Sequence, residues 1–452
     1  MLITLGGDPP EVFAAQVIFW MLLPVALFAP GRWAILAWLL MGNLDTTGPT
    51  QEASAQVGWM NAAKAIAIPI WLWWRLRREP SQVLSTLPAK LWISLGVYAA
   101  IATLWSPFPI AAIKLVGNMA GIILMVILLE KSVRGGLLGP RIFSLLIIGS
   151  LALGVLQTYV YAGRTYGFDG TDEPLRFTSF ASAQQYAGYL VAFLALLLSQ
   201  GTFARARTPL LAAVSVALIL NGSRTWIAGA GLLLIAYGWL SFRRLVAYIA
   251  FGFATMALGA LLLVNLTRLD ADSITDSSGR VTATLSAILA GHDTSHNAGL
   301  RNLNFRLAMY DAALNEIRSS DARELLFGHG TSSGGMVALR AFPARYKLDH
   351  LDPNRTIHDE WLRVFFEWGL LGLALFVGVF FTLIAGLVIK CRGRASKSPA
   401  GAVLAALPAF LAAVSTENVI AGAGNAIMMS FGIVISILWI WPPRAHARER
   451  IV

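Results

Sequence analysis

Apolar runs of close to 20 residues recur along almost the whole chain, separated by short polar or basic stretches. Runs of this length are typical of transmembrane helices. The first run is too long for one straight span and contains Pro30 and Gly31, so it predicts either one helix or two. The pattern predicts an all-α polytopic membrane protein with about 12 transmembrane helices, or 13 if the first run is double. The predicted spans are residues 11–44, 57–74, 88–105, 111–130, 141–161, 181–200, 208–221, 225–241, 245–264, 361–390, 401–417 and 422–441.

One long segment interrupts this pattern, because residues 265–360 are largely polar. The alternation of spans and basic loops places this segment on the outer side of the membrane. We expect three parts: N-terminal transmembrane helices (1–264), a large outer loop with active-site elements (265–360), and C-terminal transmembrane helices with a basic cytoplasmic tail (361–452). Inside the loop, apolar residues at helical spacing predict an amphipathic helix that lies on the membrane surface. These residues are Leu303, Leu307, Tyr310, Leu314 and Ile317.

Composition supports the membrane class and restricts the choice of partners. The chain is 57% hydrophobic and 13% charged, with a mean hydropathy of +0.66. A soluble domain carries about 25% charged residues. The net charge of +11 does not indicate a nucleic-acid partner, because lysines and arginines lie mainly in short clusters between apolar runs, as the positive-inside rule predicts. Cys391 is the single cysteine, which excludes a disulfide within the chain.

A histidine lies where the polar segment meets the span that follows it. His358 is followed directly by Asp359 and Glu360. Histidine is a natural general base near neutral pH, and a neighbouring carboxylate orients the ring and stabilises its cation. The alternative is a simple helix start, where acidic residues are favoured by the helix dipole. Four other histidines lie in the same segment, and His292 and His296 find no third ligand at the spacing of a zinc site.

Three arginines on the outer side are candidates for anion binding. Arg224 follows Gly222 and Ser223 in a short turn between two spans, where the positive-inside rule disfavours a cation. An anion site is favoured there over an arginine that reaches the lipid headgroups, because a guanidinium binds phosphate oxygens in a bidentate way. Arg301 and Arg306 lie on the predicted loop helix, where five residues of separation point them in different directions, so at most one of them is expected to face a site. The alternative is a solvated charged face of the helix, and the helix alone does not decide between the two.

A glycine-rich turn follows that helix, at residues 327–335. Its sequence is Phe-Gly-His-Gly-Thr-Ser-Ser-Gly-Gly. Such a turn is expected to present many free backbone N–H donors.

Three elements on the outer side, in this order, resemble the bacterial O-antigen ligase and O-antigen polymerase superfamily. The first is Gly222-Ser223-Arg224 at the start of a span, and the second runs from residues 305–314 to residues 326–330. The third is His358 followed by the Glu-Trp-Gly-Leu-Leu-Gly sequence of residues 367–372, which is the most specific of the three.

The resemblance implies a GT-C-like glycosyltransferase that takes a glycan from undecaprenyl diphosphate at the periplasmic face of the bacterial inner membrane. It implies no nucleotide sugar, no cofactor and no obligatory metal. Arg224 and Arg306 would hold the diphosphate, with Arg301 as the other candidate on the loop helix, and His358 would activate the acceptor hydroxyl in an inverting transfer. The glutamate and glycines of residues 367–372 would serve the packing of the helix that re-enters the membrane.

The resemblance favours an O-antigen ligase that transfers the glycan to lipid A–core, in lipopolysaccharide biosynthesis. An O-antigen or exopolysaccharide polymerase, which uses the same donor and a growing glycan as acceptor, remains an alternative, as does a protein O-oligosaccharyltransferase. A transporter of lipid-linked glycans would need charged residues along a path through the spans, where Lys64 and Lys114 are the main candidates. The expected partners are the carrier-linked glycan, its acceptor and membrane lipids, with no nucleic acid.

Overall fold

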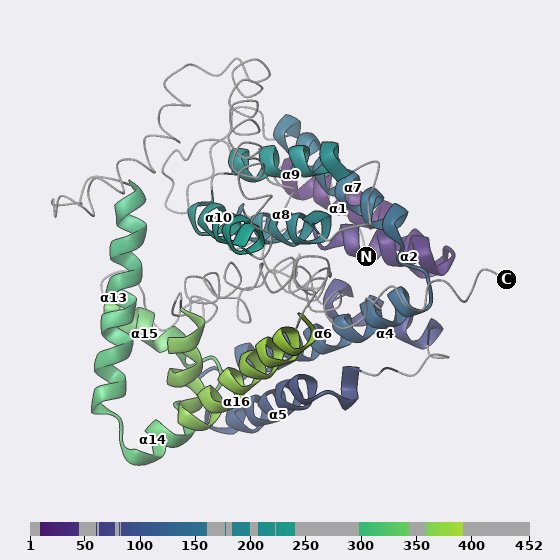
Figure 1. Ribbon diagram of the computed structural model, residues 1–452. Helices are drawn as coiled ribbons and strands as arrows, with labels where there is room; N and C mark the ends of the chain where they lie inside the picture. Colours follow the sequence, from purple (N-terminus) through teal and green to yellow (C-terminus); the bar gives the residue numbers. More distant parts are fainter. Residues whose placement is uncertain are drawn as a thin grey trace.

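The computed structural model consists of helices, with no strand among the described residues (Figure 1). The all-helical prediction is therefore confirmed for this part of the chain. The structure describes residues 10–44, 60, 63–76, 81, 83–160, 177, 183–198, 207–221, 223–239, 298–342, 357 and 359–391.

In chain order, and with the labels of Figure 1, the helices are α1 (Pro10–Phe28), α2 (Gly31–Met41), the π-helix η1 (Ala63–Ala67), α4 (Ile68–Arg75), the short 3₁₀ turns η2 (Val83–Ser85) and η3 (Thr103–Trp105) on either side of α5 (Leu87–Ala102), α6 (Pro109–Arg134), α7 (Pro140–Val160), α8 (Ala183–Leu198), α9 (Arg207–Asn221), α10 (Arg224–Trp239), α13 (Ala298–Ser319), α14 (Ala322–Phe327), α15 (Gly334–Ala341) and α16 (Glu360–Cys391).

The first apolar run forms two helices, which settles the choice between one and two. The chain breaks between α1 and α2 at Pro30, whose extended conformation (φ −51°, ψ 146°) cannot continue a helix. Carbonyls at the end of α1 lack partners within their own helix. Arg75, at the end of α4, supplies them, because its guanidinium donates to Leu27 O at 2.8 Å and to Ala29 O at 3.1 Å.

Three described helices are long and apolar enough to cross a membrane. They cover Leu87–Trp105, Pro109–Val133 and Glu360–Gly386, which confirms the spans predicted at residues 88–105, 111–130 and 361–390 as long apolar helices. Shorter apolar helices occupy further predicted regions. The spans predicted at residues 245–264, 401–417 and 422–441 lie outside the described residues, so the total of 12 and the GT-C-like arrangement stay predictions.

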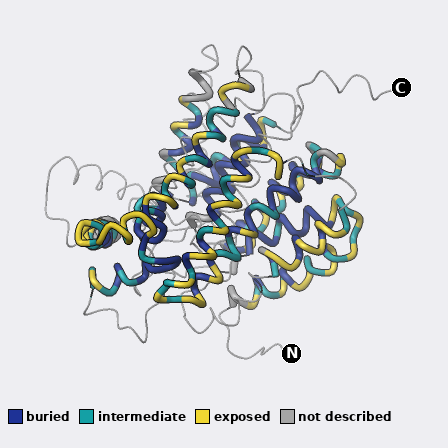
Figure 2. The backbone as a smooth tube through the Cα atoms, turned by 90° about the horizontal axis from the view of Figure 1, so that it is seen from below, coloured by how far each residue is buried: buried dark blue, intermediate teal, exposed yellow. Residues whose placement is uncertain are grey.

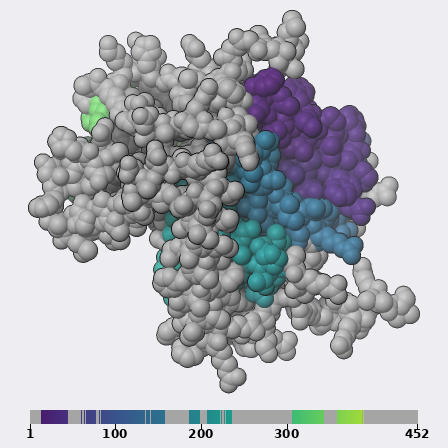
Figure 3. All heavy atoms as spheres, turned by 90° about the horizontal axis from the view of Figure 1, so that it is seen from above, coloured from purple at the N-terminus to yellow at the C-terminus, as the bar shows by residue number. Residues whose placement is uncertain are grey.

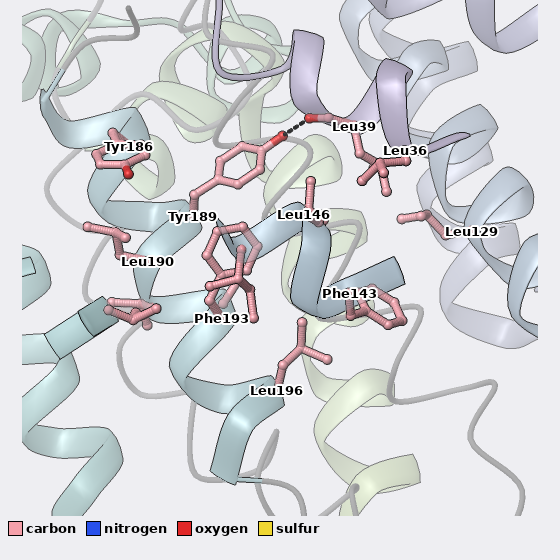
Figure 4. Close-up of a cluster of buried hydrophobic side chains, with 14 of the residues drawn as sticks. Leu36, Leu39, Leu129, Phe143, Leu146, Tyr186, Tyr189, Leu190, Phe193 and Leu196 are labelled. Atoms are coloured by element: carbon pink, nitrogen blue, oxygen red, sulfur yellow. Dashed lines mark hydrogen bonds between the residues drawn. The ribbon is translucent and has the colours of Figure 1, made fainter. Parts of the chain in front are cut away.

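A large apolar core joins the N-terminal helices α1, α2, α7, α8 and α9 with parts of α6 and α10. Helix α8 lies inside it, and its side chains from Tyr186 to Leu198 are almost completely buried. In Figure 4 the rings and leucines of α8 face Leu36 and Leu39 of α2, and the Tyr189 hydroxyl donates to Leu39 O at 3.4 Å. Seen from above, the N-terminal helices and the blue to teal helices that follow adjoin on one face of the molecule (Figure 3).

A second group of helices is built around α5 and α16, which pack side by side (Figure 1). Their shared core contains Leu95, Ala99, Trp368 and Phe376, with Met119 of α6 beside it. Helices α14 and α15 lie against α16, and α13 packs on α15. Most helices in both groups have one buried and one exposed face, as expected where an outer face meets lipid (Figure 2). The second group includes α13, α14 and α15, which belong to the predicted outer segment of residues 265–360.

Candidate functional site

The start of α16 is fixed by Asp359, directly after the position of His358. The Asp359 carboxylate accepts a hydrogen bond from Leu362 N at 3.0 Å, which makes it the N-cap of the helix. Burial raises the pKa of the Asp359 carboxyl above its ordinary value, and backbone hydrogen bonds from Leu362 and Trp361 oppose that rise. His358 itself lies outside the described residues, so its catalytic role stays a prediction. The helix-start interpretation is confirmed for Asp359.

The residue on the other side of His358 is also fixed. Ile357 is fully buried in a small apolar cluster with Met309 and Ala313 of α13, Val337 of α15 and Phe366 of α16. The backbone on both sides of His358 is therefore held, on one side by this cluster and on the other by the N-cap of α16.

Three charged residues lie on one buried face of the first turns of α16. Arg363 is completely buried and forms ion pairs with Glu360 and, at 3.0 Å, with Glu367. The guanidinium also lies 5.5 Å from the centre of the Trp368 ring. Burying a charge is costly unless it is paired, so these three residues stabilise one another only as a set. Arg363 was not among the residues predicted from the sequence, although the spacing of three, four and seven residues places all three side chains on one helix face.

Helix α16 is interrupted at Gly369, whose backbone angles (φ 61°, ψ −164°) are not helical. The interruption frees carbonyls of the preceding turn from their usual partners in the helix. The glycine-rich loop of residues 328–334 binds them: His329 N donates to Phe366 O at 3.0 Å, and Gly330 N donates to Glu367 O at 2.9 Å. We call this contact between the loop and the kink of α16 the loop–kink clamp.

The Glu367 side chain completes the clamp. Its carboxylate accepts hydrogen bonds from Ser332 N at 3.0 Å and from Gly334 N at 3.3 Å. Trp368 Nε1 donates to Thr331 Oγ1 at 2.9 Å, and Thr331 Oγ1 donates to Ala99 O of α5 at 2.6 Å. The expectation that the glycine-rich turn presents free backbone donors is therefore wrong. Four of its N–H groups bind α16, because the kink offers acceptors that a regular helix does not, and Thr331 N donates to Ala102 O of α5.

Glycines make the close approach possible on both sides of the clamp. A Cβ on Gly328 would lie 2.3 Å from Glu367 O, and a Cβ on Gly369 would lie 2.5 Å from Leu326 O. Both residues also have positive φ angles, which other residues adopt at a cost. The predicted packing role of the glutamate and glycines of residues 367–372 is confirmed by these contacts.

His329 is held by contacts at one ring face and at both ring nitrogens. Its ring stacks on Phe366 with centroids 4.3 Å apart and planes 7° apart. Nδ1 lies 3.1 Å from the Phe366 carbonyl oxygen, which only accepts, so Nδ1 carries a proton and donates. Nε2 lies 3.1 Å from Ser320 Oγ and 3.7 Å from Glu324 Oε2. Both ring nitrogens are therefore engaged within the loop and the helices beside it.

The predicted loop helix is confirmed as α13, and its predicted apolar stripe is divided between an outward face and a face packed against protein. Leu307 and Leu314 are 48% and 38% exposed, whereas Met309 and Ala313 are completely buried. Tyr310 and Ile317 are partly buried against the same cluster as Met309. The small side chain of Ala313 lets α15 approach closely, so the helix turns its leucines outward. An outward apolar stripe fits the expectation that the helix meets the membrane surface.

The three predicted arginines are described to different degrees. Arg306 is half-buried on α13, and Arg301 lies on the same helix with its side chain outside the described part. Arg224 is the first residue of α10, whose contacts are with α8 and α9, and its side chain is likewise outside the described part. The turn before it is ordered by Asn221, whose amide donates to Phe177 O at 3.0 Å. The structure brings Ile357 together with α13, and the meeting of Arg224, Arg306 and His358 stays a prediction.

The described residues contain no group of three or more His, Cys, Asp or Glu side chains that could hold a metal ion. Of the two lysines considered for a transport path, Lys64 is buried and its Nζ donates to Leu44 O, which ties it to the end of α2. Lys114 is exposed on α6.

These features define a helical membrane protein in which a polar loop is clamped onto a kinked, membrane-length helix. In a comparison with known families, residues 209–377 match the model of the O-antigen ligase family. The matched region begins in α9, ends in α16, and contains Arg224, Arg301, Arg306 and His358. This match confirms the resemblance to the O-antigen ligase superfamily, and the family together with the apolar helices supports a membrane protein. No curated protein matches the chain.

Proposed function

We propose that this protein is an O-antigen ligase of the bacterial inner membrane. It transfers a glycan from undecaprenyl diphosphate to lipid A–core at the periplasmic face, with inversion at the anomeric carbon and without a metal ion. The observation that carries the proposal is the O-antigen ligase match over residues 209–377, since this one region contains every residue to which we assign a role.

In the proposed reaction, an acceptor hydroxyl attacks the anomeric carbon of the donor glycan. The new glycosidic bond forms as the bond from that carbon to the diphosphate breaks, and the hydroxyl proton passes to His358 as general base. The carrier leaves as its diphosphate, whose developing charge must be stabilised by fixed cations. Arg224 and Arg306 supply those cations, with Arg301 as the other candidate on α13, because a guanidinium binds phosphate oxygens through two parallel hydrogen bonds.

The loop–kink clamp supports this arrangement mechanically. A general base needs its position held to within a fraction of an ångström, and rigid surroundings supply that. His358 lies between Ile357, which is buried in the α13–α15 cluster, and Asp359, the N-cap of α16. The clamp fixes the first turns of α16 to the loop, and thereby fixes the frame from which His358 acts.

The acceptor separates the ligase from the polymerase, and a deletion experiment reads it directly. Lipopolysaccharide from a strain lacking the gene is compared with that of the parent on a gel. Loss of all O-chain from core, with accumulation of carrier-linked glycan, is the expected result for the ligase. A single repeat unit left on core indicates a polymerase instead, and an unchanged ladder contradicts both functions.

Complementation assigns the result to the site. The gene carrying His358→Ala is expected to leave the ladder absent, because the acceptor hydroxyl then has no base. His350→Ala, a change of the same kind eight residues earlier in the polar segment, is the matched control and restores the ladder. Immunoblots of the membrane fraction show whether both variants accumulate to parental levels. A complete ladder with His358→Ala would remove His358 from the proposal.

A further inference from the structure

A pocket of about 450 Å³ opens between the turn after α5 and the helices α13 and α15. Its volume falls within the range of small-molecule sites, roughly 300–1,000 Å³. Trp105 and Pro107 line one side, and Glu316, Ser333, Arg340 and Phe366 are among the residues of the other sides. None of the residues that line it is assigned to donor binding or proton transfer in the proposed reaction, although His329 and Phe366 belong to the loop–kink clamp.

One buried polar group in this pocket lacks a partner. Ser333 is 2% exposed, and within the described part of the chain its Oγ has no hydrogen-bond partner. Buried hydroxyl groups are normally hydrogen-bonded, so an unsatisfied one at a pocket wall indicates a ligand group that completes it. A hydroxyl both donates and accepts, which suits a ligand that is itself rich in hydroxyl groups.

The charges around the pocket argue against an anionic ligand. Glu316 is paired with Arg340, and Glu324 lies beside His329. A diphosphate placed here would meet two carboxylates and a guanidinium that is already paired. Neutral hydroxyl groups avoid that repulsion and accept or donate hydrogen bonds to the same groups.

The pocket also has an aromatic wall. Trp105 is half-buried and anchored by its indole N–H, which donates to Gly328 O at 3.3 Å, so its ring position is fixed by the loop–kink clamp. Phe366, with His329 stacked on it, lies on the same pocket. Aromatic rings pack against the C–H faces of sugar rings, while carboxylate, guanidinium and hydroxyl groups bind the sugar hydroxyls.

We infer that this pocket is a saccharide-binding subsite, with Ser333 as a direct hydrogen-bonding residue and Trp105 as its aromatic wall. The subsite lies close to the reacting position, because Val337 and Phe366 both line the pocket and pack in the cluster that holds Ile357. The inference rests on the proposed function for the choice of glycan. That glycan is either the acceptor core or the donor O-chain, which share the chemistry described above.

Binding of free saccharide by the full-length protein in nanodiscs tests the inference without requiring transfer. Two probes are titrated by calorimetry: core oligosaccharide released from lipid A by mild acid, and O-polysaccharide fragments from the same lipopolysaccharide. Binding of the first assigns the subsite to the acceptor, and binding of the second assigns it to the donor. Inorganic pyrophosphate serves as a third probe, and we expect its binding to be unaffected by changes in the pocket.

Two variants and one control make the result specific. Ser333→Ala is expected to weaken saccharide binding about five- to tenfold, the effect of one lost hydrogen bond. Its unfolding temperature should be unchanged or raised, because the buried hydroxyl has no partner in the described chain. Met336→Trp fills the pocket and should weaken binding further. Ser319→Ala removes an exposed hydroxyl outside the pocket lining and should bind saccharide as the parent does.

The outcomes separate this inference from the proposed function. If neither saccharide binds, or if Ser333→Ala and Met336→Trp both bind like the parent, the subsite is disproved even where transfer proceeds normally. If saccharide binding depends on Ser333 while the parent protein transfers no carrier-linked glycan, the subsite stands and the ligase function falls. Loss of pyrophosphate binding in Ser333→Ala would overturn the assignment to a saccharide.

Discussion

The apolar bundle of α1, α2, α7, α8 and α9 is held together differently from the loop–kink clamp on α16. In the bundle, buried leucine, alanine and aromatic side chains of α8 pack against their neighbours, and hydroxyl groups such as that of Tyr189 add isolated hydrogen bonds (Figure 4). In the clamp, a buried arginine, two glutamates and the loop amides are linked to one another.

This contrast indicates which helices are held in an exact relative position. Lipid is as apolar as leucine, so apolar packing alone specifies the relative position of two membrane helices weakly. Linked hydrogen bonds and close glycine contacts specify it strongly, because one displacement leaves several buried groups unsatisfied. The clamp holds the first turns of α16, the helix that directly follows His358 in the sequence, whereas the bundle supplies a scaffold. Four substitutions test, through their effect on stability, whether the two regions are held in different ways.

The largest loss of stability is expected from Glu367→Ala in the clamp. It removes one of the two carboxylates paired with Arg363 and the acceptor of Ser332 N and Gly334 N, so that one side of the guanidinium and two backbone amides lose their partner. Breaking a buried ion pair in this way costs roughly 3–5 kcal/mol. The folded fraction after heating in detergent, followed by size-exclusion chromatography, measures the loss. Glu367→Gln keeps one acceptor oxygen, so its stability should fall between that of the parent and that of Glu367→Ala. Parental stability in Glu367→Ala would mean that the clamp does not hold the loop.

Gly369→Ala should destabilise the protein by about 3 kcal/mol, from the positive φ angle and the contact with Leu326. Gly386→Ala is the matched control on the same helix, because a Cβ there meets no atom within 4 Å. Thermal unfolding of the two variants in the same detergent compares them. An equal and small effect in both would show that the kink of α16 is not required.

Tyr189→Phe tests a hydrogen bond of the apolar bundle and should cost only about 0.6 kcal/mol, the average for such bonds between membrane helices. The Tyr189 hydroxyl donates to Leu39 O at the long distance of 3.4 Å, and the ring itself is retained. The same unfolding assay is used as for Glu367→Ala. A loss as large as that of Glu367→Ala would contradict the contrast between the two regions.

The smallest effect is expected from Asp359→Asn, and it depends on pH. Asparagine keeps the cap on Leu362 N but does not ionise. Because burial raises the pKa of Asp359 in the folded state, its contribution to stability is fully present below the unfolded-state pKa and is lost as the pH rises through the folded-state pKa. The stability of the variant should therefore rise relative to that of the parent as the pH increases above about 4, by no more than roughly 0.5 kcal/mol because solvent screens a half-buried carboxyl. A stability gain of Asp359→Asn over the parent that grows toward acid pH would contradict this prediction.

Hydropathy predicted the long helices at residues 88–105, 111–130 and 361–390 because backbone groups in lipid must be satisfied within a helix. It also predicted the helix at residues 300–317, now α13. It did not predict which face of α13 is buried, because periodicity marks an apolar face without saying whether protein or lipid covers it. Met309 and Ala313 face the protein, while Leu307 and Leu314 face outward.

The sequence predicted only part of the loop–kink clamp. The Glu-x-Gly-x-x-Gly sequence indicated packing. The reason for a glycine at residue 369 includes a close contact with the backbone of Leu326, which lies more than forty residues earlier. The donors of residues 328–334 looked free because their acceptors exist only once α16 is kinked. The spacing of Glu360, Arg363 and Glu367 on one face of an apolar helix was present in the sequence, and such charges in a membrane helix are a signal in their own right.

We propose that His358 activates the acceptor within a site that the clamp positions. Purified protein in nanodiscs, supplied with carrier-linked glycan and lipid A–core, tests it most directly when transfer and carrier binding are measured on the same sample. We predict that His358→Ala abolishes transfer and leaves carrier binding largely intact, while Arg224→Ala weakens binding as well. Full transfer by His358→Ala in this purified system would contradict the account.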